Sequence, residues 1–141
     1  MKEVDITREM IEDVARRVGL PIDLYDQDWF VRMVNANDAA RLINHYDSFT
    51  KPEDKSVLMW FIIKAYDYYL RNCVHEGQIP DLNLEKKLVK QLQENWAEHE
   101  DAVEYWSFFD HGDNEPVDEA DAFEVTPLMR KLWKEHKRTA N

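Results

Sequence analysis

Carboxylate side chains are concentrated in one part of this sequence, between residues 91 and 129. That segment holds twelve aspartates and glutamates and no lysine or arginine, so its formal charge is −12. Residues 1–90 carry −3, and residues 130–141 carry +4. Carboxylates in such number can bind metal ions, exchange protons in acid–base catalysis, or attract a positively charged partner.

Sequence motifs for catalysis or metal binding do not explain this charge. No histidine has a glutamate three positions before it, as carboxylate-bridged di-iron bundles require, and there is no HExxH, glycine-rich phosphate loop or cysteine pair. The oxygen-rich residues 110–121 lack the register of an EF-hand calcium loop. We therefore expect no catalytic residue, no metal site and no cofactor. A metal-binding or acid–base enzyme without a known motif remains the alternative.

One short string is similar to the His-x-Asp catalytic loop of kinase-like phosphotransferases, namely His111-Gly112-Asp113. In those enzymes an asparagine five residues after the aspartate holds magnesium, whereas this chain has Asp118 there. The chain is also too short for a kinase fold. The string is therefore interpreted as a turn.

The acidic segment also carries large aromatic side chains, which suggests a surface that docks a protein. At helical spacing, Glu98, Asp101, Tyr105 and Phe108 share one side of a helix. Carboxylates about one turn apart would attract a surface built to bind nucleic acid, and the aromatic rings would anchor it. The predicted partner-binding residues are Glu94, Glu98, Asp101, Tyr105, Phe108, Asp113, Glu115, Asp118, Glu119 and Asp121.

This arrangement resembles in type the small acidic helical proteins that neutralise nucleases or block DNA-binding proteins, although no motif assigns a family. The hypothesis is a non-enzymatic protein that binds a basic protein partner, such as a nuclease toxin or a nucleic-acid-binding protein. The same charge disfavours direct contact with nucleic acid or an anionic membrane. Two alternatives stay open: a homodimer, which the five tryptophans favour, and a purely structural role in which basic residues 130–138 neutralise a solvated acidic face.

Length and composition predict one soluble helical domain over residues 1–141, because a chain of this size can bury an adequate core unaided. The single cysteine, Cys73, cannot form an internal disulfide, which suits a reducing compartment. The N-terminus shows no apolar signal segment, and the longest apolar run, residues 57–63, is too short to cross a bilayer. We expect a cytoplasmic protein.

The predicted fold is an all-α bundle of five or six helices. Thr7 and Gly19 bound the first helix, a short helix is expected near Trp29, and another over residues 38–49 with Asn37 as its cap. Residues 51–76 are apolar on nearly every side, which predicts a buried central helix.

The acidic half is predicted to hold two further helices. Apolar residues recur at helical spacing from Leu84 to Trp106, which predicts one long acidic helix over residues 83–110. An acidic loop is expected over residues 111–126. Thr126-Pro127 is typical of a helix start and predicts a C-terminal helix over residues 127–138.

Overall fold

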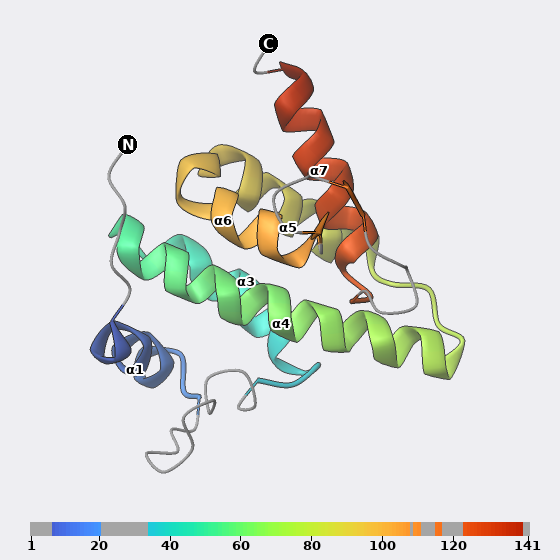
Figure 1. Cartoon of the computed structure of the whole chain (residues 1–141). Coiled ribbons are helices and arrows are strands. Elements are labelled where there is room, and N and C mark those ends of the chain that lie inside the picture. Colours follow the sequence, from blue (N-terminus) through green and yellow to red (C-terminus); the bar gives the residue numbers. More distant parts are fainter. Residues whose placement is uncertain (1–6, 21–33, 108, 111–114, 117–122, 140–141) are drawn as a thin grey trace. The chain divides into compact units, whose positions relative to one another are not determined.

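The computed structural model describes residues 7–20, 34–107, 109–110, 115–116 and 123–139. Over these residues the protein has an all-α fold (Figure 1). The prediction of an all-α fold is confirmed. Contacts group the chain into two compact units, Met1–Asn72 and Cys73–Asn141, which are described separately below. The expectation of a single domain stays a prediction. Among the helices described, none is both long and apolar enough to span a membrane.

The first unit begins with helix α1, Arg8–Arg17, whose predicted start is confirmed. The Thr7 hydroxyl accepts a hydrogen bond from the Met10 amide at 3.2 Å, which satisfies one of the free N–H groups of the first turn. Gly19 follows with φ +72°, the left-handed conformation that ends a helix and that side chains disfavour. The short helix predicted near Trp29 lies outside the described residues.

Helix α3, Asp38–His45, continues into the 3-10 helix η1, Tyr46–Ser48, so the predicted helix over 38–49 ends with a tighter turn. Asn37 makes no side-chain capping hydrogen bond. Instead its amide donates to the Asn35 side chain at 3.0 Å, and the Asp38 carboxylate accepts from the Asn35 amide at 3.0 Å. The capping role predicted for Asn37 is therefore wrong, because the Asp38 side chain turns back to the preceding loop.

Arg17 connects α1 to the start of α4, Pro52–Glu76. Its Nη1 donates to Asp54 Oδ2 at 2.8 Å and to Asp13 Oδ2 at 3.3 Å. Its guanidinium carbon lies 4.3 Å from the centre of the Phe49 ring. The hydrogen bond to Asp54 raises the pKa of Arg17, so this cation stays charged at every ordinary pH.

Helix α4 matches the helix predicted over residues 51–76. The side chains buried along it include Val57, Leu58, Met59, Phe61, Ile62, Ile63 and Tyr66. Asp67 is also fully buried although it is acidic, and its Oδ2 lies 3.6 Å from Arg71 Nη2. Gly77 at φ +68° ends the helix.

The second unit contains α5, Leu82–Glu94, α6, Trp96–Trp106, and α7, Thr126–Thr139. Two strands of two residues each, β1 (Phe109–Asp110) and β2 (Glu115–Pro116), pair antiparallel between α6 and α7. Part of the predicted acidic loop is therefore paired. Most of the remainder of that loop lies outside the described residues. The predicted C-terminal helix is confirmed within one residue at each end.

The single long helix predicted over residues 83–110 is wrong, because the chain leaves helical geometry at Asn95 (φ −124°, ψ 42°). The Asn95 side chain donates from Nδ2 to the Gln91 carbonyl at 3.3 Å, a local bond with which asparagine competes against the helix. The next residue, Trp96, stacks on His136 of α7 with ring centres 4.1 Å apart. Packing against α7 therefore accompanies a break that helical periodicity does not reveal.

The core of this unit is formed by α5, α6 and α7, and α7 crosses α6 and packs against it (Figure 1). Its buried side chains include Leu88, Leu92, Val103, Trp106, Met129 and Leu132. His99 is also fully buried.

Candidate partner-binding face on α6

Helix α6 has one buried side and one exposed side. His99, Ala102, Val103 and Trp106 are buried, whereas Asp101, Glu104 and Tyr105 are exposed. Glu98, half-buried, lies at the edge of the exposed side because it is one turn before Asp101. We call Glu98, Asp101, Glu104 and Tyr105 the α6 acidic face.

Three of the predicted partner-binding residues lie together on this face, namely Glu98, Asp101 and Tyr105. Glu94 does not continue it, because α5 ends at Glu94 and α6 begins at Trp96. Glu94 is exposed, and its Oε1 lies 3.9 Å from Lys90 Nζ. Glu94 and Glu98 are therefore not neighbours on one continuous helix, and the grouping of Glu94 with this face is wrong.

The described structure places none of the other predicted residues on the α6 acidic face. Phe108, Asp113, Asp118, Glu119 and Asp121 lie outside the described residues. Glu115 is described through its backbone only, in β2, opposite Asp110.

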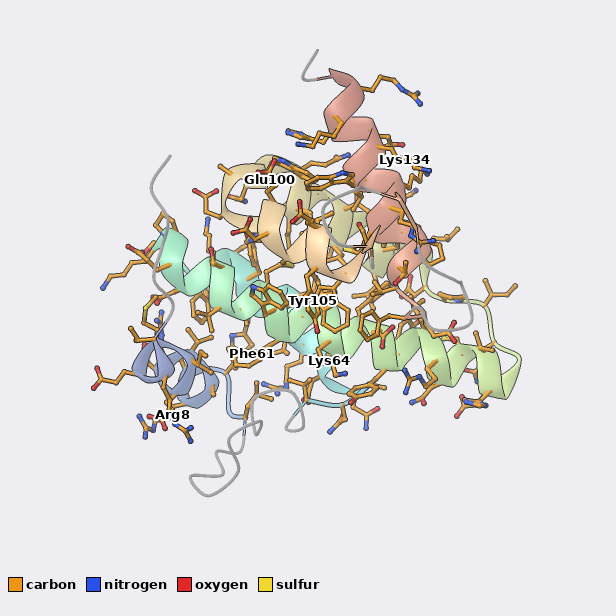
Figure 2. The ribbon with its side chains drawn as sticks, in the orientation of Figure 1. Arg8, Phe61, Lys64, Glu100, Tyr105 and Lys134 are labelled. Atoms are coloured by element: carbon orange, nitrogen blue, oxygen red, sulfur yellow. The ribbon has the colours of Figure 1, made fainter. Side chains whose placement is uncertain are left out.

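Tyr105 is the exposed aromatic side chain of the face, with 56% of its surface accessible (Figure 2). Its ring contacts Trp106 edge-on at 5.3 Å and Phe123 at 6.3 Å between ring centres. Trp106 and Phe123 contact each other at 4.5 Å. A ring that is supported on one side and open on the other can bury area on a partner while losing little conformational freedom.

Two cations of α7 have a described contact with α6: Lys137 approaches Glu100, and Arg130 binds the Ser107 carbonyl at the end of the helix. Lys137 Nζ lies 4.0 Å from Glu100 Oε2, which also accepts a hydrogen bond from Trp96 Nε1 at 3.1 Å. Figure 2 shows Glu100 on the side of α6 nearer α7 and Tyr105 near the other end of the helix. This contact between α6 and the basic helix therefore falls on Glu100 and not on Asp101.

The C-terminal end of α6 is joined to the start of α7 by two hydrogen bonds to main-chain carbonyls, and a third closes the last turn of α6 itself. The Ser107 hydroxyl donates to the Val103 carbonyl at 2.7 Å, and the Thr126 hydroxyl donates to the Trp106 carbonyl at 2.9 Å. Arg130 Nε donates to the Ser107 carbonyl at 2.8 Å. These bonds satisfy carbonyls that a helix end leaves unpaired, and the guanidinium complements the negative end of the helix dipole. The last turn of α6, which carries Tyr105, is thereby fixed.

Glu104 is the residue of this face that the sequence-based prediction left out. The structure exposes it three residues after Asp101, so the two carboxylates are neighbours on the helix surface. The signal was present in the sequence, since Glu104 keeps helical spacing to both Glu100 and Asp101. It was left out because the predicted line was drawn along a continuous helix from Glu94.

The described residues contain no group of three or more histidine, cysteine, aspartate or glutamate side chains placed to hold a metal ion. The carboxylates of the α6 acidic face are spread along the helix surface, a distribution that suits attraction of a cationic surface. No protein-family model matches the chain, and comparison with curated proteins and with solved structures finds no significant match.

Proposed function

We propose that this protein is a non-enzymatic binding protein whose α6 acidic face engages a positively charged protein. The observation that carries the proposal is the exposure of Asp101 and Glu104 beside the exposed ring of Tyr105 on one side of a fixed helix. The Nζ of Lys137 on α7 lies 4.0 Å from Oε2 of Glu100, which is not one of these three residues.

The three side chains would contribute to binding in different ways. Clustered carboxylates raise the rate at which a cationic partner is captured, and salt weakens this effect. Tyrosine is among the residues that most often carry interface energy, because it buries a large apolar ring and can donate a hydrogen bond. Asp101 and Glu104 would therefore govern association, and Tyr105 would govern the lifetime of the complex.

The expected class of partner is a protein that itself binds nucleic acid, such as a nuclease toxin. Its basic surface is built to meet regularly spaced negative charges, and carboxylates one turn apart on a helix lie about 5–6 Å apart at their Cβ atoms. A helix of eleven residues is about 16 Å long, so α6 would form the centre of an interface and not the whole of it.

One observation favours the second candidate, a purely structural acidic surface neutralised within the chain. Lys137 and Glu100 are close enough to form an ion pair. Their side chains are 53% and 28% exposed, however, and exposed pairs contribute roughly 0–1 kcal/mol. This contact alone is therefore a weak source of neutralisation.

The test compares two double variants that change the net charge by the same amount. Asp101→Lys with Glu104→Lys alters the proposed face, and Asp47→Lys with Glu76→Lys alters exposed carboxylates in η1 and at the end of α4. The partner is captured from the native cell, identified, purified, and measured by surface plasmon resonance at low and high salt.

We expect the first variant to slow association about tenfold or more at low salt, and the second to leave it nearly unchanged. Tyr105→Ala should mainly speed dissociation. Equal loss in both double variants would show that net charge alone drives binding, and the proposed face would then be rejected.

A further inference from the structure

A groove runs between α5 and α7 on the second unit, and Trp96 at the start of α6 lines one part of it. Two adjoining hollows of about 280 Å³ and 470 Å³ form it, and they share Gln93, Leu132 and Glu135. Its apolar side chains are Val89 on α5, Trp96 at the start of α6, and Leu128 and Leu132 on α7. We call this hollow the α5–α7 groove.

The rim of the α5–α7 groove is positive, although the chain as a whole carries −11. Four cations line it: Lys86, Lys90, Lys131 and Arg138. All four are exposed. The carboxylates that line it are Glu85 and Glu135, and Glu94 beside it lies 3.9 Å from Lys90 (Oε1 to Nζ), so four cations face three carboxylates and the rim keeps one excess positive charge. A local positive field on an acidic protein selects a negatively charged occupant.

The apolar floor of the groove requires an occupant that has apolar surface as well as negative charge. Val89, Trp96 and Leu128 are half-buried, so each still presents apolar surface to the groove. Leu132 closes the floor between them and is buried. Free phosphate or another small anion would leave this surface in contact with water, whereas an amphipathic chain segment would cover it.

The dimensions fit a helix of about three turns. Leu128 and Arg138 mark the two ends of the groove on α7, and ten residues of helix span roughly 15 Å. A groove between two helices, with an apolar floor and charged rims, is the recognised receptor for an amphipathic helix with apolar residues at i, i+3, i+4 and i+7.

We infer that the α5–α7 groove binds an acidic amphipathic helix of another protein. The occupant would place its apolar stripe on Val89, Leu128 and Trp96 and its carboxylates against Lys86, Lys90 and Lys131. This inference goes beyond the proposed function, because it concerns a second surface with the opposite charge. The protein would then join a basic partner on α6 to an acidic partner in the groove.

The probe is a synthetic, end-capped helical peptide of about fourteen residues, with leucine at i, i+3, i+4 and i+7 and glutamate at the flanking positions. A second peptide has the same leucines with lysine in place of glutamate, and a third has glutamine. Each carries a fluorescent label and is titrated with the full chain in low and high salt, and binding is followed by anisotropy.

The variants compare rim cations with a cation on the same helix that does not line the groove. Lys131→Glu reverses one rim charge and Lys86→Glu with Lys131→Glu reverses two, and Lys134→Glu, exposed on α7 (Figure 2), is the matched control for the single rim variant. All three positions are exposed, so the substitutions should leave the fold intact, and circular dichroism checks this.

We expect saturable binding of the glutamate peptide, weakened about tenfold by the double variant and less than threefold by Lys134→Glu. The lysine peptide should bind the unaltered protein weakly and the double variant more tightly, because the two substitutions make the rim of the groove negative. Absence of saturable binding by the glutamate peptide would overturn the inference. So would equal affinity for all three peptides, or equal loss in Lys131→Glu and its control Lys134→Glu.

Discussion

The Thr126 hydroxyl forms the hydrogen bond that tests most directly whether α6 and α7 hold each other in place. It donates to the Trp106 carbonyl at 2.9 Å and accepts from the Phe123 amide at 3.1 Å, in a buried position. Thr126→Val keeps the shape of the side chain and removes both bonds. A buried carbonyl left without a partner costs about 1–3 kcal/mol, and the second lost bond adds up to about 1 kcal/mol. We expect a loss of about 2–3 kcal/mol.

The matched control is Thr126→Ser, which retains the hydroxyl and removes one methyl group, at a cost of about 1 kcal/mol. Unfolding in urea is followed by tryptophan fluorescence and by far-ultraviolet circular dichroism, since the Trp106 carbonyl accepts the Thr126 hydrogen bond between α6 and α7. If valine costs less than about 0.5 kcal/mol, or if serine costs as much as valine, the hydroxyl does not hold the two helices together. The fixed position of Tyr105 would then lose its physical basis.

Three smaller predictions follow from contacts elsewhere. Arg17→Ala should lower the free energy of unfolding by about 1 kcal/mol, because the pair with Asp54 is partly exposed; Arg17→Lys should recover part of it, measured by urea denaturation. Gly77→Ala should cost about 1 kcal/mol through backbone strain alone, since φ is +68° and no atom lies within 4 Å of the added Cβ; the thermal midpoint reports it. Lys137→Ala should cost about 1 kcal/mol at low salt and less in 1 M salt, because salt screens the contact with Glu100 but leaves the contact of Nζ with the Trp133 ring, 4.5 Å from the ring centre; urea denaturation at the two salt concentrations measures the difference.

Local sequence signals predicted most of the helices because each acts over a few residues. Thr7 caps α1, Gly19 and Gly77 adopt the left-handed conformation after their helices, and the apolar residues of α4 form a buried helix. These features depend on neighbours along the chain, so spacing and residue type suffice to predict them.

The errors arose where a distant residue decides the local structure. Leu92 and Trp96 keep helical spacing through Asn95, yet the chain breaks there and Trp96 stacks on His136, forty residues later in the sequence. Asp67 has the type and position of a surface residue and is buried. Periodicity contains no information about such partners, which explains why Glu94 was grouped with the α6 acidic face.

The position of the basic helix decides how much of the acidic segment can act on another molecule. Had α7 covered Asp101 and Tyr105, its cations would have removed both the field and the aromatic anchor on which the proposal for α6 depends. Instead Arg130 binds the end of α6 and Lys137 approaches Glu100. Glu100 is one helical turn before Glu104, so Lys137 weakens the negative field at that edge of the face, and physiological salt limits the reach of an exposed charge to about 8 Å. The α6 acidic face and the rim of the α5–α7 groove carry charges of opposite sign, which is why they are proposed to select partners of opposite sign.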